Sequence, residues 1–334
     1  MFSLRVAIIG CGRMGTQHAH VAAQLGHRVA VVCDTDPARA SGLAQTYPHC
    51  AAVADPGEIR WSALDAGFVC TPPFVRGLAE LMAAQAGVPL FLEKPIGLSA
   101  SQCLPALRLI RASGTITSVG YMNRYRGSVQ RVRDFLETEP ALGFVGHWVG
   151  PAYRVPWWAD PALSGGQLNE QCTHLIDLAR YLVGEITEVS AFAQRSPEDE
   201  ARNAAVSVLL RFQNGTLGTV LCGCFAKEKQ IGCRIFTPRG QLTLEGWDFR
   251  LAPIAQLGDL PGAAGEEDVF FAETSAFLAA VQSGDARAIR SDLADAMRTQ
   301  RVVDAARAAL IDGDRRAIGP ERTMEEVSHA LGPT

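Results

Sequence analysis

The stretch RVAIIGCGRMG, residues 5–15, decides the fold of this chain. An apolar run that suits a buried strand passes into three glycines spaced as G-x-G-x-x-G, and a helix-like segment follows. Gly10 allows a tight turn, Gly12 lets a pyrophosphate approach the backbone, and Gly15 lets the helix pack closely on the strand. Free N–H groups at the helix N-terminus favour phosphates. The stretch therefore predicts a dinucleotide site formed by Gly10, Gly12, Arg13, Met14 and Gly15.

Asp34 ends the next expected strand and favours NAD over NADP as the cofactor. A carboxylate at this place accepts hydrogen bonds from the adenosine ribose but repels a 2′-phosphate. Thr35 and Asp36 follow, where an NADP site would more often offer an arginine. The alternative is a purely structural glycine turn, and the strand, helix and acidic residue around the glycines argue against it. NADP stays the second cofactor candidate.

Short apolar runs alternate with helix-like segments in the first third of the chain. We expect strands at 5–9, 28–33, 66–70, 89–92 and 116–120, and helices at 14–25, 37–47, 74–86 and 99–112. Such alternation indicates βαβ units. Residues 1–121 are therefore predicted to form an α/β Rossmann domain with a doubly wound parallel sheet.

The remaining residues, 122–334, have a different texture. Strands are expected at 206–212, 216–225, 231–237 and 241–244, with hairpin turns at Asn214-Gly215 and Pro238-Arg239-Gly240. Helices are expected at 167–182, 269–281 and 293–310. This pattern predicts an α+β domain for substrate binding and oligomerisation, with a mainly antiparallel open sheet. A single substantial covering helix would leave one sheet face free, so we expect a homodimer or homotetramer.

The bulk composition excludes several classes of protein. A net charge of −4 without a block of Lys or Arg argues against nucleic acid as a partner. No apolar run reaches the roughly 18 residues of a membrane span, and no secretion signal is evident. The nine cysteines are an odd number without zinc-site spacing, so no metal is expected and the thiols suit a reducing, cytoplasmic compartment.

Several chemically active side chains follow the expected parallel strands. If the strand order is 3-2-1-4-5-6, the carboxyl ends of these strands meet at one crevice. Thr71, Pro72, Glu93 and Lys94 then lie beside the nicotinamide half of the cofactor. A surface ion pair is the alternative for the Glu93-Lys94 dipeptide.

The stretch SGGQLNEQCTHLID, residues 164–177, is the second informative segment. Two glycines lead into a helix on which Glu170, His174 and Asp177 stand near one face, at i, i+4 and i+7. Taken alone, His174 would more often be a hydrogen-bonded structural histidine.

These features together resemble the glucose–fructose oxidoreductase / inositol dehydrogenase (Gfo/Idh/MocA) family over essentially the whole chain. The matching segments are the glycine loop, Thr71-Pro72-Pro73, Glu93-Lys94-Pro95, Gly165-Gly166 and the helix with Glu170 and His174. The resemblance implies a Rossmann domain followed by an α/β domain whose open sheet often serves as an oligomer interface. It also implies that Lys94 and His174 are active-site residues, and that substrates are sugars, inositols or their keto forms.

Two positions depart from the family pattern. Glu170 stands where the family usually has Asp, and Arg76 where it commonly has His. The permanent charge of Arg76 could favour an acidic substrate group, or its side chain could lie outside the pocket.

Oxidation of an alcohol requires a base for the hydroxyl proton while hydride leaves the carbon. His174 suits this role at neutral pH, with Lys94 stabilising negative charge on the oxygen. Lys94 could instead accept the proton if desolvation lowers its pKa. Glu170 either orients His174 or binds a substrate hydroxyl, whereas Asp177 is expected to be structural.

Two further segments are substrate candidates. Tyr153, Trp157 and Trp158 could form a pocket wall, with core packing or an oligomer contact as the alternative. Asn123 and Arg124 directly follow the last Rossmann strand and resemble a family segment near the nicotinamide.

The sequence thus predicts an NAD(P)-dependent dehydrogenase or ketoreductase that acts on a secondary alcohol or ketone of a sugar, cyclitol or related polyol. One alternative is redox-assisted, NAD-dependent glycoside cleavage. The other is a non-enzymatic nucleotide-binding regulator, against which the presence of both Lys94 and His174 argues. Neither the substrate nor the direction of the reaction follows from the sequence.

Overall fold

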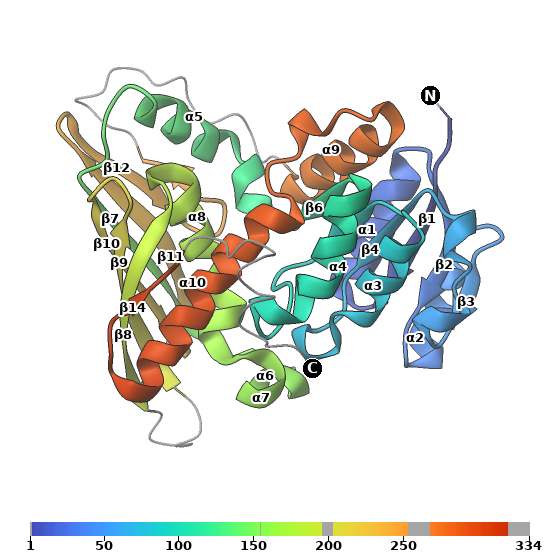
Figure 1. The fold of residues 1–334 in the computed structure, drawn as a ribbon, viewed down its shortest axis with the longest axis horizontal. Coiled ribbons are helices and arrows are strands. Elements are labelled where there is room, and N and C mark those ends of the chain that lie inside the picture. The colour runs from blue at the N-terminus through green and yellow to red at the C-terminus, as the bar shows by residue number, and fades with distance from the viewer. Residues whose placement is uncertain (1, 154, 196–202, 253–267, 320–334) are drawn as a thin grey trace, which may run out of the picture.

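The computed structural model of the chain describes residues 2–153, 155–195, 203–252 and 268–319. Two β-sheets lie at opposite sides of the molecule, and most helices pack on or between them (Figure 1). Among the described helices, none is long and apolar enough to cross a membrane.

The N-terminal sheet has six parallel strands in the order β3-β2-β1-β4-β5-β6. The strands are β1 (Arg5–Ile9), β2 (Arg28–Cys33), β3 (Ala51–Val53), β4 (Ala66–Val69), β5 (Leu90–Leu92) and β6 (Thr117–Val119). The helices between them are α1 (Arg13–Gln24), α2 (Pro37–Ala44), α3 (Leu78–Gln85) and α4 (Ala100–Ser113). The predicted doubly wound parallel sheet is confirmed, and the strand order reverses between β1 and β4.

Both faces of this sheet are buried, which explains its nearly continuous apolar strands. Along β1, Ala7 and Ile9 join one core with α3 and α4, whereas Val6 and Ile8 join a second core with α1 and α2. This alternation follows from the two-residue period of a strand.

The second sheet has eight strands in the order β13-β12-β11-β7-β10-β9-β8-β14, and every pair except β7–β10 is antiparallel. Its strands are β7 (Gly143–Pro151), β8 (Ile186–Arg195), β9 (Asn203–Phe212), β10 (Leu217–Gly223), β11 (Phe225–Thr237), β12 (Gly240–Glu245), β13 (Arg250–Leu251) and β14 (Arg316–Ala317). The predicted hairpins at Asn214-Gly215 and Pro238-Arg239 are confirmed. β7, β8, β13 and β14 are additional to the expected strands.

Helices cover one face of the second sheet. They are α5 (Gly127–Leu136), α8 (Thr173–Val183) and α10 (Leu293–Asp312), which pack on strand residues such as Phe144 and Val208. The helix expected at 167–182 is instead a π-helical turn, Leu168–Cys172, that continues into α8.

The opposite face of this sheet exposes large apolar side chains. The strand register places Val145, Leu209, Leu217, Leu221 and Phe236 on this one face, pointing away from the helices. No helix within the described residues covers them.

The chain returns to the Rossmann sheet after completing most of the second one. Helix α9 (Val269–Ser283) packs on α1, and its Phe277 and Leu278 lie in the same core as Val6 and Ile8. The first turns of α10 add Leu293 and Met297 to the core on the other face. Figure 1 shows α9 beside the Rossmann helices. The boundary at residue 121 stays a prediction, because residues from beyond it help to cover both faces of the first sheet.

Candidate active site

The glycine loop has the backbone geometry that its sequence requires. Gly10 has φ = +92°, and a Cβ there would lie 2.8 Å from the carbonyl carbon of Cys70. A Cβ on Gly15 would lie 1.9 Å from the carbonyl oxygen of Gly10, so only glycine lets α1 approach the loop. A Cβ on Gly12 would meet no atom within 4 Å. This open space in front of the N-terminus of α1 suits a pyrophosphate.

Asp34 lies at the end of β2, against the glycine loop. Its carboxylate accepts hydrogen bonds from the backbone N–H groups of Cys11 at 2.8 Å and Asp36 at 2.9 Å. These bonds fix the carboxylate beside the loop, where the adenosine ribose of a dinucleotide would lie. Arg13 and Met14 form the first turn of α1, with Arg13 exposed and Met14 half-buried.

Arg76 holds the ends of β4 and β5 together from outside the pocket. Its buried guanidinium donates to the backbone carbonyl oxygens of Thr71 at 2.9 Å, Val69 at 3.0 Å and Glu93 at 2.8 Å. It also lies 3.6 Å from the buried carboxylate of Glu80. Its donors are directed at the main chain, which favours the structural one of the two roles left open by the sequence. Thr71 and Pro72 are half-buried, and the hydroxyl of Thr71 has no hydrogen-bond partner.

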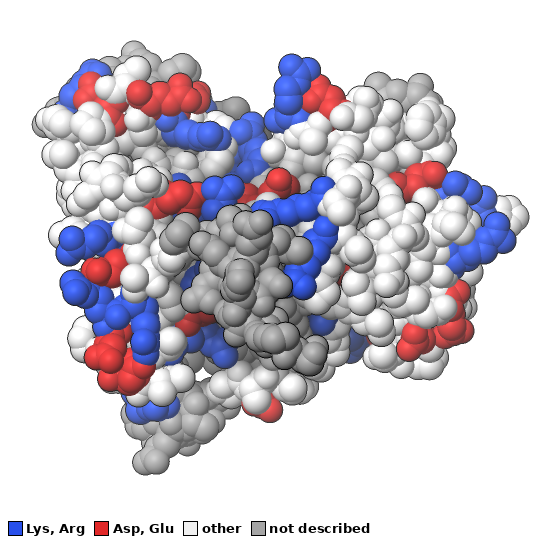
Figure 2. Space-filling view, viewed as in Figure 1, with Lys and Arg blue, Asp and Glu red and all other residues white. Residues whose placement is uncertain are grey.

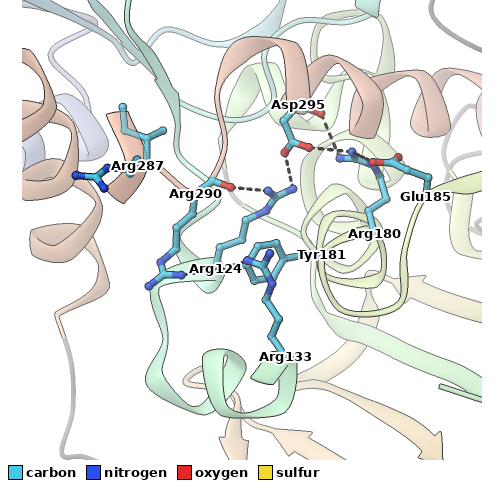
Figure 3. A pocket seen from close by; sticks show the side chains of 9 residues that line it. Arg124, Arg133, Arg180, Tyr181, Glu185, Arg287, Arg290 and Asp295 are labelled. Atoms are coloured by element: carbon cyan, nitrogen blue, oxygen red, sulfur yellow. Dashed lines mark hydrogen bonds and ion pairs between the residues drawn. The ribbon is translucent and has the colours of Figure 1, made fainter. Parts of the chain in front are cut away.

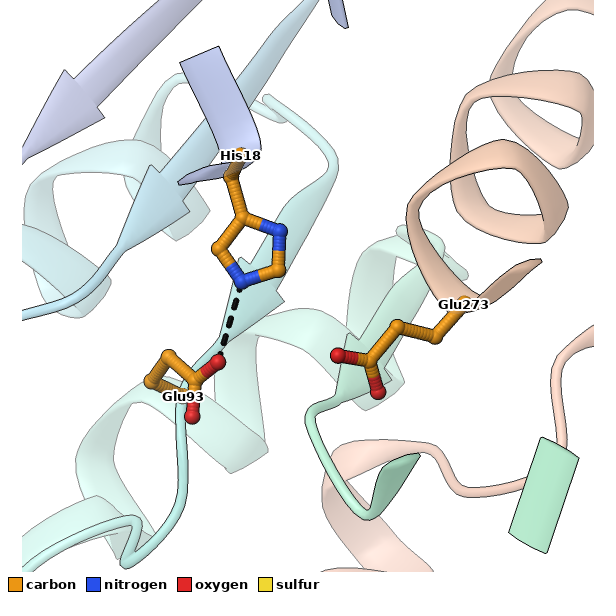
Figure 4. A group of neighbouring side chains, drawn as sticks. All are labelled: His18, Glu93 and Glu273. Carbon is orange, nitrogen blue, oxygen red and sulfur yellow. Dashed lines mark hydrogen bonds and ion pairs between the residues drawn. The ribbon is translucent and has the colours of Figure 1, made fainter. Parts of the chain in front are cut away.

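Glu93 points into the Rossmann domain. Its carboxylate lies 2.9 Å from Nε2 of His18, whose Nδ1 lies 2.8 Å from the hydroxyl of Thr274 in α9. Figure 4 shows Glu273 directed at the same place, with a fully buried carboxylate that has no hydrogen-bond partner. Burial, reinforced by Glu93, raises the pKa of Glu273 well above its ordinary value. The contact with His18 therefore anchors Glu93, the residue before Lys94.

The side chains of His18, Glu93 and Glu273 could together offer three ligand atoms to a metal ion. Both nitrogens of His18 are already engaged in hydrogen bonds. The absence of a metal site stays a prediction, and in the structure the bond between His18 and Glu93 supports the backbone next to Lys94.

Lys94 points in the opposite direction, towards the second domain. Its Nζ donates to the backbone carbonyl oxygen of Glu170 at 3.1 Å and lies 3.9 Å from the Glu170 carboxylate. Burial raises the pKa of Glu170, although the positive charges of Lys94 and Arg76 oppose this. The structure thus brings together Lys94 and Glu170 from the two domains.

His174 lies in the first turn of α8 and is almost completely buried. Its ring stacks on Trp148 with centroids 5.2 Å apart and an interplanar angle of 11°, and it meets Tyr121 edge-on at 6.5 Å. Burial, followed by the charges of Lys94 and Arg126, lowers the pKa of His174 well below its ordinary value. These surroundings therefore disfavour the charged imidazolium.

Glu170 and His174 do not bond to each other in the structure. Glu170 Oε1 and His174 Nδ1 are both buried, and each lacks a hydrogen-bond partner. Glu170 belongs to the π-helical turn, whereas His174 belongs to α8. The expectation that Glu170 orients His174 is thus not seen, because the Glu170 carboxylate lies near Lys94 instead. Its contact with a substrate hydroxyl stays a prediction.

Asn123 and Arg124 diverge although they are adjacent. Asn123 Oδ1 accepts from Arg126 at 2.8 Å, and its Nδ2 is buried without a partner. The guanidinium of Arg124 instead makes a bidentate pair with Asp177, at 2.6 and 2.9 Å, and contacts Asp295 at 2.7 Å. Asp177 thus has the structural role expected for it, as the partner of Arg124. The guanidinium of Arg124 is held by Asp177 and Asp295.

The aromatic segment before the glycines contributes a chain of ring contacts. Trp157 and Trp158 lie in the short helix α6 (Pro156–Ala159), which precedes α7 (Pro161–Ser164). Tyr153 packs edge-on against Trp158 at 5.4 Å, and Lys229 Nζ lies 5.4 Å from the Tyr153 ring. Lys229 also lies 5.3 Å from the ring of Trp247, which contacts the Trp148 that stacks on His174. The rings of Tyr153 and Trp158 thus connect to the surroundings of His174.

No sequence pattern indicates Trp148 and Arg126 as neighbours of His174. Trp148 lies in β7, which the sequence does not predict as a strand because it contains several glycines. Arg126 lies in the turn before α5, and its charge is one cause of the lowered pKa of His174. An aromatic residue in an unassigned strand and an arginine in a loop look alike in many folds, so only the three-dimensional arrangement identifies them.

Several candidate site residues have buried polar atoms without hydrogen-bond partners. These atoms include Thr71 Oγ1, Asn123 Nδ2, Glu170 Oε1 and His174 Nδ1. Buried polar groups are normally hydrogen-bonded, so such unpartnered atoms are typical of a site completed by a ligand. The open space at Gly12 and the fixed Asp34 carboxylate extend the same site towards a dinucleotide.

Comparison with known families agrees with this geometry. Residues 4–121 match the family model described as "Oxidoreductase family, NAD-binding Rossmann fold", and residues 142–243 match the "GFO/IDH/MocA C-terminal domain". The chain belongs to the Gfo/Idh/MocA family. As a member of this family it is an oxidoreductase with an NAD-binding Rossmann domain, and the predictions of family, fold class, enzyme class and NAD are confirmed.

Relatives of this Gfo/Idh/MocA protein include a myo-inositol dehydrogenase of Streptomyces leeuwenhoekii, 28% identical over 80% of this chain and 82% of the relative. An inositol 2-dehydrogenase of Mycolicibacterium gilvum is 32% identical over 55% of this chain, and the alignment spans only 54% of that relative. A solved levoglucosan dehydrogenase in complex with NADH has a TM-score of 0.83 at 20% identity, covering 96% of this chain and all of that one. At this identity the structural likeness shows the fold.

Proposed function

We propose that this protein is an NAD-dependent dehydrogenase that oxidises a secondary alcohol of a cyclitol, sugar or related polyol, or reduces the corresponding ketone. The observation that carries the proposal is geometric: Lys94, which follows a Rossmann strand, donates to the carbonyl oxygen of Glu170 at 3.1 Å, and His174, four residues after Glu170, has a buried Nδ1 without a hydrogen-bond partner. The inositol and sugar dehydrogenases among its relatives support this substrate class.

His174 is proposed to take the hydroxyl proton. Its Nδ1 is buried without a hydrogen-bond partner and is thus free to receive that proton, while Lys94 lies nearby on the other domain. Lys94, now bonded to the carbonyl oxygen of Glu170, would donate to the substrate oxygen and stabilise its developing negative charge. NAD, when bound, supplies the acceptor for the hydride that leaves the carbon.

Glu170 is proposed to act on Lys94 and on the substrate. Its carboxylate lies 3.9 Å from Lys94 Nζ, and its free Oε1 can accept a hydrogen bond from a substrate hydroxyl. Glu93 would keep the backbone of Lys94 in place through His18. Asn123 Nδ2 and the rings of Tyr153, Trp157 and Trp158 are the further candidates for substrate contact.

The cofactor contacts are proposed from the loop geometry. Gly10, Gly12, Gly15 and the first turn of α1 would hold the pyrophosphate, and Asp34 the adenosine ribose. A carboxylate fixed by two backbone N–H groups cannot move aside for a 2′-phosphate without breaking those bonds. NAD is therefore proposed to bind more tightly than NADP.

A homo-oligomer is proposed to assemble through the open face of the second sheet. Five exposed apolar side chains from four strands, Val145, Leu209, Leu217, Leu221 and Phe236, lie on that face. A second copy of the chain would bury them in an isologous contact. The nine free cysteines suit a cytoplasmic protein.

The function is tested by following NADH formation with a panel of inositols, aldoses and anhydrosugars, with His174→Ala as the control for the proton acceptor. Net NADH formation from one of these compounds, lost in the variant, is the expected result. Cleavage of a glycoside without net NADH would instead establish redox-assisted cleavage. A thermal-shift screen in the presence of NAD would find candidate substrates first, since a bound ligand raises the melting temperature.

A further inference from the structure

A cavity of about 420 Å³ lies on the helix side of the second domain, away from Lys94. It opens between α8, the start of α10 and the segments at 124–133 and 287–290, and Figure 3 shows Arg124 and Arg133 gathered around Tyr181, with Arg287 directed away. Figure 2 shows Lys and Arg side chains on both sides of the notch between the regions of α5 and α9. The lining residues are Arg124, Arg133, Arg180, Tyr181, Glu185, Arg287, Ile289, Arg290 and Asp295.

The floor of the cavity is neutralised by its own carboxylates. Arg124 pairs with Asp177 and Asp295, both within 2.7 Å. Arg180 lies 2.9 Å from Asp295 and 2.8 Å from Glu185. Arg298 also pairs with Glu185 at 3.1 Å and Asp295 at 3.8 Å, so the carboxylates of the floor are shared among Arg124, Arg180 and Arg298.

Arg133 and Arg290 have no carboxylate partner among the described residues. Both guanidinium groups donate to the phenol oxygen of Tyr181, which also receives the amide of Gln130. Arg290 donates in addition to Oε1 of Gln130, and Nε2 of Gln130 to the carbonyl oxygen of Arg124. The guanidinium groups of Arg124 and Arg133 lie 4.7 and 4.3 Å from the centroid of the Tyr181 ring. Three cationic groups thus surround one neutral phenol.

The hydroxyl of Tyr181 cannot satisfy all of these donors. A phenol oxygen has two lone pairs, and three donors point at it. Burial opposes ionisation, but the donors from Gln130, Arg290 and Arg133 nevertheless lower the pKa of Tyr181. In addition, Nε of Arg290 is buried and has no hydrogen-bond partner. The site therefore has spare donors and uncompensated positive charge, and an acceptor with negative charge would complete it.

We propose that this cavity binds an oxyanion, a phosphate or carboxylate group of a small molecule, through Arg133, Arg290 and the hydroxyl of Tyr181. Guanidinium groups bind the oxygens of phosphates and carboxylates in pairs, with charge-assisted hydrogen bonds. The cavity volume exceeds that of bare phosphate, which leaves room for an organic part of the ligand. The site is separate from the dinucleotide loop and independent of the proposed dehydrogenase activity.

Calorimetric titration of the full chain tests the proposal, with inorganic phosphate, glucose 6-phosphate and citrate as the probes. Saturating NADH is present throughout, so that the pyrophosphate site is blocked. The variants are Arg133→Gln, Arg290→Gln and the double variant. The matched control is Arg239→Gln. Arg239 is an exposed arginine in the β11–β12 hairpin, and it pairs with Glu139. Tyr181→Phe removes the hydroxyl while keeping the ring, and circular dichroism verifies folding of each variant.

At least one probe should bind the wild type, and the double variant should bind it at least about tenfold more weakly, equivalent to roughly 1.4 kcal/mol. Arg239→Gln should bind like the wild type. Tighter binding of glucose 6-phosphate or citrate than of inorganic phosphate would identify an organic ligand, whereas equal binding would identify free phosphate. Absence of binding by the wild type at millimolar concentration, or equal affinity in the folded double variant, would overturn the proposal.

Discussion

Replacing Arg76 by Met is expected to destabilise the Rossmann domain far more than the loss of an ordinary surface arginine. The substitution keeps an unbranched side chain but removes three donors from the carbonyl oxygens of Val69, Thr71 and Glu93. It also leaves the buried carboxylate of Glu80 without its cation.

The magnitude follows from the surroundings of these groups. A hydrogen bond to a charged group contributes about 1.5–3 kcal/mol, and breaking a buried ion pair by removing one partner costs about 3–5 kcal/mol. The carbonyl of Val69 keeps a second donor, the N–H of Glu93 at 2.9 Å, so the three bonds do not add in full. We therefore expect a loss of about 3–5 kcal/mol in the free energy of unfolding.

Urea unfolding followed by circular dichroism measures this loss. The matched control is Arg5→Met, which breaks an exposed pair with Asp65 and should cost no more than about 1 kcal/mol. Adding Glu80→Gln to Arg76→Met should recover part of the loss, because the unpaired buried charge is then gone. A loss within about 1 kcal/mol for Arg76→Met, or no recovery in the double variant, would refute the anchoring role.

Four further predictions concern the site and the open sheet face. Lys94→Ala and His174→Ala should each lower turnover by about 10²-fold or more without changing NADH affinity, measured by steady-state kinetics and fluorescence titration; wild-type turnover in either would contradict their roles. The pKa of His174 is lower in the folded than in the unfolded state, so the native state binds fewer protons and stability is lost as the pH falls below about 6.5. In His174→Asn this part of the loss should disappear from melting curves recorded at decreasing pH. Asp34→Ala should weaken NAD binding more than NADP binding in calorimetry, and tighter wild-type binding of NADP would disprove the assignment. Phe236→Glu should shift the light-scattering mass from an oligomer towards the monomer, and a monomeric wild type would exclude the proposed interface.

The backbone of the Rossmann domain could be predicted because its determinants are local. Glycine spacing, apolar runs and the return of helices give strands β1, β2, β4, β5 and β6 and their order. β3 has only three residues, two of them exposed alanines, and so carries no apolar pattern. β7 contains three glycines within nine residues, a composition typical of turns, although they serve a strand packed between two others.

Side-chain directions at the site could not be predicted in the same way. The sequence places Glu93 and Lys94 at one strand end, but only the structure shows that Glu93 points back to His18 and Lys94 forward to Glu170. The spacing of Glu170 and His174 assumes a regular α-helix, whereas a π-helical turn contains the first of them. The partners of Arg76 are backbone carbonyls, which any sequence supplies, so no sequence pattern could indicate them.

The return of α9 to the first sheet affects how the chain can be synthesised and divided. Helices α1 and α2 cover part of the sheet face that carries Phe68, but the part that packs edge-on against Phe277 at 5.4 Å stays exposed until α9 has been made. At about 5–20 residues per second, translation of the intervening segment takes on the order of 10–40 s. During that time an apolar surface is exposed to other nascent chains, and a chaperone that covers it would raise the yield of folded protein. A fragment that ends between the two domains lacks α9, so the Rossmann domain expressed alone would have an incomplete core.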